Sequence, residues 1–333
     1  METSRRLGLT RTRRPLILFP CRLATASTRY RPPRARTRCD SLRGLRMCEL
    51  LAMSSLEPAT LSISLEAFSE RGGLRAPHKD GWGAAFYAGR DVRRLRETGA
   101  ASQSSGIRFL SEQQYRSRLV LAHVRQATKG AVSLENTQPF ARELGGRMHV
   151  FAHNGDLIGI EEATAPDLGR FRPIGDTDSE HAFCLLLARL APLWEAPEPP
   201  PLDLRLEVVR RFAALLRPFG PANFLYSDSE YLFAHGHERT QESCGRIEPP
   251  GLFTLCRTCP AKIEGRAPKP IEGLTLGLTE AHQRVTLIAS VPLTAERWEP
   301  VGAGEVLAIA GGRILSRTGA ALPESSGPQL AES

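Results

Sequence analysis

The chain has no long apolar segment. Its apolar runs are short and interrupted, as at residues 185–190 and 285–291, and none approaches the roughly 20 apolar residues that a membrane helix requires. The composition, with 41% hydrophobic and 24% charged residues, is that of a soluble globular protein rather than of a disordered or fibrous chain. We therefore expect a soluble protein with no membrane partner.

Cysteine is scarce, and its number is odd. There are seven cysteines in the chain, and the short apolar run at residues 15–20 is too brief and too rich in proline for a secretory signal. An odd count in a chain long enough to bury a large core argues against a disulfide framework. A reducing compartment, and by default the cytoplasm, is the expectation.

Acidic residues are nearly absent from the front of the chain. Residues 1–46 hold 13 Arg and no Lys against Glu2 and Asp40, a net charge of +11, so that residues 47–333 carry −3 of the total of +8. A basic stripe on a folded surface would favour nucleic acid, but the basic residues of the body are mixed with acids. We expect no nucleic-acid partner. The leader has the composition of an organelle transit peptide, and a start codon assigned too far upstream explains it equally well; we favour the misplaced start, or else removal of the segment.

From residue 48 onward, many short strand patterns surround a few helical ones. Strands are predicted at residues 49–53, 82–87, 119–124, 148–153, 223–227, 231–235, 285–291 and 305–310. Helices are predicted at residues 61–71, 179–190 and 204–216, with Asp178 and Ser179 as caps of the second. The proline-rich segment 191–201 reads as an irregular surface loop, because successive prolines remove backbone donors. Residues 47–316 are the expected domain, and residues 317–333 a disordered tail.

Four segments carry candidate chemistry, and the first is centred on Cys48. Met47 precedes a small residue, so its removal would leave a thiol and a free α-amine on Cys48 at the start of a strand. The α-amine has an ordinary pKa of about 7.7–8.0 and can act as the base for its own thiol. A buried structural cysteine is the alternative reading.

The other three segments are ambiguous when each is taken alone. Arg125 leaves a strand end, where its guanidinium could hold a carboxylate. Asn154-Gly155 terminates a strand and is also an ordinary turn signal. Asp178 opens a helix, where an acidic residue commonly caps the N-terminus.

Together the segments resemble a family. Residues 47–310 resemble the class II glutamine amidotransferases, most closely the compact stand-alone members of the YafJ type. The resemblance rests on residues 47–51, 78–83, 122–128, 134–140, 152–155 and 176–180, with residues 292–294 and Trp298 downstream. It implies an α+β fold, the four-layer αββα sandwich of N-terminal-nucleophile (Ntn) hydrolases, in which two antiparallel sheets face each other.

The resemblance also implies roles for individual residues. Cys48 is expected to attack the side-chain amide of glutamine, and the Asn154 side chain with the Gly155 N–H to form the oxyanion hole. Arg125 is expected to bind the substrate α-carboxylate and Asp178 its α-ammonium. Thr128 matches a further position that lines the glutamine pocket.

Some residues are left outside this assignment. His123 and His153 are interpreted as structural, because the α-amine supplies a base. Residues 80–83 are expected to shape the pocket wall, with a core role for Trp82 as the alternative. Cys256 and Cys259 form only one cysteine pair where structural zinc usually needs two, so neither a metal nor a cofactor is expected.

The resemblance leaves the acceptor of the ammonia open. No synthase domain accompanies the amidotransferase pattern in this chain, so a separate ammonia-accepting synthase is one expectation. The alternatives are a stand-alone hydrolase of another γ-glutamyl compound, as in ergothioneine-type pathways, and a non-catalytic protein if Cys48 does not become the N-terminus.

Overall fold

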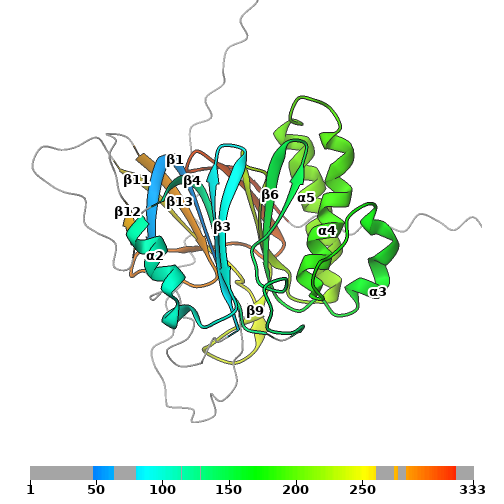
Figure 1. Cartoon of the computed structure of the whole chain (residues 1–333), viewed down its shortest axis with the longest axis horizontal. Coiled ribbons are helices and arrows are strands. Elements are labelled where there is room, and N and C mark those ends of the chain that lie inside the picture. Colours follow the sequence, from blue (N-terminus) through cyan, green and yellow to red (C-terminus); the bar gives the residue numbers. More distant parts are fainter. Residues whose placement is uncertain are drawn as a thin grey trace, which may run out of the picture. The chain divides into compact units, whose positions relative to one another are not determined.

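Two antiparallel sheets form the centre of the fold (Figure 1). The computed structural model describes residues 48–63, 80–113, 115–127, 129–259, 274–276 and 283–319. Within these residues, all strand pairs in both sheets are antiparallel. The expected antiparallel architecture is therefore confirmed.

The larger sheet contains the strand that follows Cys48. Its strand order is β14 (Glu299–Pro300), β11 (Phe253–Cys259), β13 (Gln283–Ala289), β1 (Glu49–Ile63), β4 (Arg116–Val124), β2 (Trp82–Ala88) and β3 (Asp91–Glu97), and β12 (Leu274–Leu276) also pairs with β1.

The second sheet contains the Asn154-Gly155 strand. Its order is β16 (Arg313–Thr318), β15 (Glu305–Ala310), β8 (Leu232–Gly236), β7 (Asn223–Ser227), β6 (Arg147–Asn154) and β5 (Phe140–Leu144). A separate two-stranded hairpin joins β9 (Arg239–Thr240) to β10 (Ile247–Glu248).

The run Glu49–Met53 is almost entirely apolar because β1 is covered on both faces. Leu50 and Ala52 lie in the core between the two sheets, together with Val150 and Leu225 of the second sheet. Leu51 and its neighbours of the same parity lie in the core on the outer face of the larger sheet. Alternate side chains of a strand point to opposite faces, so a strand between two cores loses the polar half of its pattern.

Helices cover the outer faces of both sheets. Helices α4 (Asp178–Leu190) and α5 (Leu202–Leu216) pack on the second sheet through aromatic rings: Phe183 stacks on Phe151 with ring centroids 5.4 Å apart, and Phe212 meets Phe224 at 5.4 Å. Residues of α2 (Ser105–Gln113) belong to the core on the outer face of the larger sheet (Figure 1). The layers run helix, sheet, sheet, helix, which confirms the predicted αββα sandwich.

Several shorter elements complete the described chain. They are α3 (Ile160–Thr164) and four 3₁₀ turns, η1 (Ala101–Gln103), η2 (Ala165–Leu168), η3 (Ala191–Trp194) and η4 (Arg217–Phe219). None of the described helices is long and apolar enough to cross a membrane.

The structure corrects four local expectations. Leu61–Ile63, predicted as the start of a helix, continue β1 because they pair with Leu274–Leu276; the rest of that predicted helix lies outside the described residues. The cap of α4 is Thr177, whose hydroxyl accepts the Glu180 N–H at 3.3 Å, and not Asp178 or Ser179. The segment expected to be irregular begins with the 3₁₀ turn η3, since proline fits the first turn of a helix. The expected tail starts within β16, which runs to Thr318, and residues beyond 319 are not described.

Candidate active site

The four candidate segments meet at one end of the two sheets. Cys48 directly precedes β1 and Arg125 directly follows β4, and because these strands are antiparallel neighbours with Glu49 opposite Val124, both residues lie at the same sheet end. Asn154 ends β6 in the facing sheet, and its side-chain amide donates to the Cys48 carbonyl oxygen at 2.6 Å. This hydrogen bond joins the two sheets beside the thiol.

The Cys48 thiol is held against the backbone of Gln126. Its Sγ lies 3.3 Å from both the Gln126 N–H, which donates to it, and the Gln126 carbonyl oxygen, to which the thiol donates. Burial raises the pKa of the Cys48 thiol to about 12, against the opposing effects of the Gln126 backbone and the Arg125 charge. The thiol is therefore protonated near neutral pH, and a base is needed before it can attack.

Gly155 occupies a position that only glycine can fill. Its φ is +142°, and a Cβ there would lie 1.7 Å from the Pro221 carbonyl oxygen. The close passage of the Pro221 segment fixes the peptide that carries the Gly155 N–H. Asn154 and Gly155 are thus set rigidly next to Cys48.

The guanidinium of Arg125 is buried inside the loop that follows β4. It is 3% exposed and donates to the carbonyl oxygens of Lys129 at 2.9 Å and Ala131 at 3.0 Å. Within the part of the chain that the structure describes, Arg125 forms no ion pair with a carboxylate. A buried cation without a counter-ion is costly, and an incoming carboxylate would relieve that cost.

Asp178 at the start of α4 holds the turn that follows Gly155. Its Oδ2 accepts the Leu157 N–H at 2.7 Å and its Oδ1 the Ser179 N–H at 2.7 Å. The carboxylate is 5% exposed and ties α4 to the residues directly after the Asn-Gly pair.

Two further sequence expectations have different outcomes. Thr128 lies outside the described residues. Asp80 supports the Arg125 loop, because its Oδ2 accepts the Ala127 N–H at 2.9 Å. Trp82 is fully buried in the outer core, where its indole N–H donates to Glu97, so the core interpretation of Trp82 is the correct one.

Gln138 is a site-supporting residue that the sequence did not single out. Its side-chain amide pairs with the backbone of His153 in both directions, accepting the N–H at 2.6 Å and donating to the carbonyl oxygen at 3.1 Å. The amide therefore holds the residue directly before Asn154. Its position within segment 134–140, part of the family resemblance, was the only signal in the sequence.

The histidines near the site are buried and neutral. The His153 ring contacts the Ser179 hydroxyl at 2.9 Å, and burial lowers the pKa of His123 to about 3. Cys256 lies on β11, with its Sγ 3.5 Å from the Thr286 hydroxyl, and the Cys259 side chain is not described. No group of three or more His, Cys, Asp or Glu in the described ranges is arranged to hold a metal ion.

A pocket of about 190 Å³ opens beside Cys48 and was not anticipated from the sequence. It is lined by Asn154 and Gly155 together with Glu238, Arg239 and other residues of the β9–β10 hairpin. The hairpin is fixed by a buried ion pair at 2.9 Å between Arg239 and Glu49, the residue next to Cys48. These hairpin residues lie about 190 positions from Cys48 in the chain, so no local pattern could connect them to it.

Comparison with known proteins agrees with this geometry. Residues 47–331 match the family model described as "Glutamine amidotransferases class-II". The Escherichia coli (strain K12) protein YafJ, whose name assigns it to the glutamine amidotransferases, is 36% identical over 260 residues, covering 78% of this chain and 96% of YafJ.

Solved structures show the same fold. The crystal structure of a predicted glutamine amidotransferase from Pseudomonas aeruginosa PA01 superposes with a TM-score of 0.58 at 34% identity, covering 81% of this chain and all of the other. A glutamine phosphoribosylpyrophosphate amidotransferase from B. subtilis has a TM-score of 0.52 at 16% identity, covering 83% of this chain and 50% of that one, and shares the fold alone.

The fold is that of the Ntn hydrolases, in which the catalytic nucleophile is the first residue of the mature chain. Within that class, this chain belongs to the class II glutamine amidotransferase family.

Proposed function

We propose that this protein hydrolyses the side-chain amide of L-glutamine, with Cys48 as nucleophile, and releases ammonia. The observation that carries the proposal is the junction of Cys48, Asn154 and Gly155 at one end of the two facing sheets. A thiol beside two candidate oxyanion donors is the minimum arrangement for acyl transfer through a thioester.

The base is the α-amine that Cys48 gains when the preceding chain is absent. In the full chain the Cys48 nitrogen belongs to the peptide bond with Met47 and cannot accept a proton. A free α-amine, with an ordinary pKa of about 7.7–8.0, takes the thiol proton directly or through water. The thiolate then attacks the amide carbon, the C–N bond breaks and the nitrogen leaves with the proton as ammonia. Water hydrolyses the thioester to glutamate.

Asn154 and Gly155 supply the donors for the oxyanion. The Asn154 side-chain amide donates one of its two hydrogens to the Cys48 carbonyl oxygen, and the second can be donated to the substrate oxyanion. Gly155 contributes its backbone N–H, held in place by the Pro221 contact. Loss of one such donor typically lowers the rate about 10²- to 10³-fold.

Arg125 and Asp178 are the proposed clamps for the zwitterionic end of the substrate. The buried guanidinium of Arg125 would bind the α-carboxylate, which supplies its missing counter-ion. Asp178 would bind the α-ammonium, with Thr128 lining the same pocket. Fixing both charges positions the amide carbon relative to the thiol.

The domain bounds, the exposure of Cys48 and the fate of the ammonia are also proposals. The amidotransferase domain would span residues 47–316 together with the last residues of β16, with Cys48 exposed by removal of what precedes it. The ammonia would pass to a separate synthase in the cytoplasm.

The test uses the full chain with a site-specific protease sequence inserted directly before Cys48. Cleavage that leaves Cys48 as the first residue should switch on the release of ammonia and glutamate from L-glutamine in equal amounts. The uncleaved chain and a cleaved Cys48→Ala variant are the controls, and both should be inactive. Equal activity before and after cleavage would refute the α-amine as base.

A further inference from the structure

The residues that line the pocket beside Cys48 differ from those of the proposed amino-acid clamp. It is lined by Cys48, Asn154 and Gly155 and by the β9–β10 hairpin, but neither Arg125 nor Asp178 lines it. If the α-amino and α-carboxylate groups bind at Arg125 and Asp178, the pocket at Cys48 is left to the group on the other side of the amide, which is the leaving amine.

The pocket is too large for ammonia alone. Its volume is about 190 Å³, whereas a molecule the size of water or ammonia needs roughly 10–15 Å³ on the same scale. We propose that this pocket is a leaving-group subsite for γ-glutamyl amides of larger amines, an inference that rests on the proposed function. Within this subsite, Glu238 selects amines that carry a second positive charge.

The charge on the pocket wall favours a cation. Arg239 lines the pocket, but its guanidinium is committed to Glu49 at 2.9 Å and to the Ser290 carbonyl oxygen. Asp156 is engaged in contacts of its own. The Glu238 carboxylate forms no hydrogen bond or ion pair with the residues that the structure describes, although the Glu238 backbone carbonyl accepts from Asn223. It is therefore available to an ammonium group.

The remaining wall suits a short alkyl chain. Ile158 and Ile247 both line the pocket and are 81% and 56% exposed, unusually high for large apolar side chains. Methylene groups placed against them would shield both from water. An aliphatic diamine meets both requirements, with its reacting nitrogen next to Cys48, its methylenes against the isoleucines and its distal ammonium near Glu238.

The reaction follows the same course as with glutamine. The Cys48 thiolate attacks the γ-carbonyl carbon, the bond between that carbon and the amine nitrogen breaks, and the amine leaves with the proton taken from the thiol. Water then hydrolyses the thioester to free glutamate, so no further reactant is required.

The experiment compares three substrates with the cleaved protein that begins at Cys48. They are L-glutamine, the γ-glutamyl amide of butylamine and the γ-glutamyl amide of 1,4-diaminobutane, the last two differing in one terminal ammonium group. We expect kcat/KM for the diaminobutane amide to exceed that for the butylamide at least fivefold, the effect of about one charge pair near the surface. Both amides should be cleaved at a rate at least equal to that of glutamine.

The variant Glu238→Gln should lower the ratio between the charged and the neutral amide about fivefold. The matched control is Glu242→Gln, which removes the same charge from the exposed turn of the same hairpin, outside the pocket lining, and should leave that ratio as it was. Raised salt should lower the ratio in the wild type and not in Glu238→Gln.

The outcomes separate the two proposals. Turnover of glutamine with no turnover of either larger amide would overturn the subsite and leave the proposed function standing. Equal cleavage of the two larger amides by wild type and Glu238→Gln would overturn the role of Glu238. Absence of Cys48-dependent turnover of all three substrates would overturn the proposed function itself.

Discussion

At the scale of single residues, the site depends on positions whose replacement has a defined steric result. Gly155→Ala places a methyl group 1.7 Å from the Pro221 carbonyl oxygen at a φ of +142°. The peptide must shift, so we expect kcat for glutamine hydrolysis to fall about 10²- to 10³-fold as the oxyanion donor moves. Steady-state kinetics of the cleaved protein measures this.

The matched control is Gly159→Ala. Gly159 also has a positive φ, +79°, but a Cβ there meets no atom of the described residues within 4 Å. The Gly159→Ala variant therefore has the backbone strain without the steric collision, and its kcat should stay within a few-fold of the wild-type value. A similar loss of kcat in both variants would mean that strain alone, rather than the position of the Gly155 N–H, explains the effect.

A substitution at Gln138 tests whether catalysis requires the backbone of His153, the residue before Asn154, to be fixed by hydrogen bonds. Gln138→Met keeps the length of the side chain but removes both hydrogen bonds to the His153 backbone. We expect kcat to fall about 10- to 100-fold with little change in KM, because a small displacement of a catalytic group costs rate rather than binding. A rise in KM at constant kcat would instead assign Gln138 to substrate binding.

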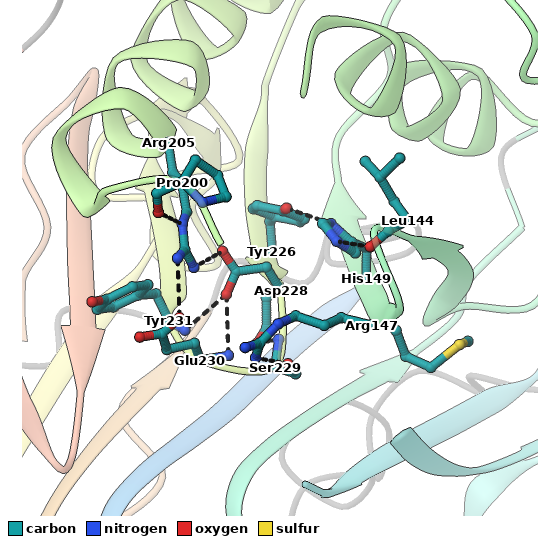
Figure 2. Close-up of polar contacts among 12 residues, drawn as sticks. Leu144, Arg147, His149, Pro200, Arg205, Tyr226, Asp228, Ser229, Glu230 and Tyr231 are labelled. Atoms are coloured by element: carbon teal, nitrogen blue, oxygen red, sulfur yellow. Dashed lines mark hydrogen bonds and ion pairs between the residues drawn. The ribbon is translucent and has the colours of Figure 1, made fainter. Parts of the chain in front are cut away.

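At the scale of secondary structure, helix α5 is anchored to the β7–β8 turn by one buried arginine (Figure 2). Arg205 is 3% exposed and donates to Asp228 at 2.9 Å and to Glu230 at 3.0 Å, while its guanidinium lies 4.9 Å from the ring centroids of both Trp194 and Tyr231. Asp228 is fully buried, so the loss of Arg205 would leave its charge without its partner.

Arg205→Met should therefore lower the free energy of unfolding by about 3–5 kcal/mol. The comparison is Arg210→Met on the same helix, whose ion pair with Glu207 is exposed to solvent and should be worth at most about 1 kcal/mol. Urea unfolding of both variants and of the double variant Arg205→Met/Asp228→Asn measures these changes in the free energy of unfolding. Equal losses in the two single variants would refute the special role of the buried pair.

Two strands whose bounds were predicted correctly from the sequence are buried on both faces. Asn223–Ser227 and Glu305–Ala310 have the bounds expected from their continuous apolar runs, and both are interior strands. Strand β3, Asp91–Glu97, was missed because it lies at the edge of its sheet and is rich in charged residues. Strand β16 was missed for the same reason, being an edge strand with alternate residues exposed.

The same reasoning explains what could be anticipated of the site. Cys48, Arg125, Asn154 and Asp178 each belong to a local motif at the start or the end of a strand or at the start of a helix. Glu238 and Arg239 reach the site only through the folding of a distant hairpin against Glu49. Their local sequence, His237-Glu238-Arg239-Thr240, reads as an ordinary polar turn, and only the pairing of the sheets reveals its place.

At the scale of the whole molecule, buried neutral histidines should make the fold sensitive to acid. Burial lowers the pKa of His123, His149 and His235 from 6.5 to about 3. Between pH 6.5 and 3 the unfolded chain binds protons at these positions and the folded chain does not, so stability is retained above pH 6.5 and lost as the pH falls below it. By pH 5 each histidine should cost as much as about 2 kcal/mol, since one pKa unit corresponds to about 1.4 kcal/mol.

The three losses together reach at most about 6 kcal/mol, the lower end of the stability of a typical domain, so we expect the free energy of unfolding to fall steeply between pH 6.5 and pH 5. Urea unfolding between pH 8 and pH 5 measures the slope of the free energy of unfolding against pH. The variant His235→Asn should make this slope shallower by up to one proton. Asparagine is chosen because it can still donate to the Ala222 carbonyl oxygen that His235 contacts at 2.6 Å. An unchanged slope in that variant would show that His235 is protonated in the folded protein. Protonation of His149 beside Tyr226, or of His235 beside Ala222, must break the present hydrogen bonding or leave a buried charge. A free energy of unfolding that stays constant from pH 7 to pH 5 would therefore contradict the role of all three histidines.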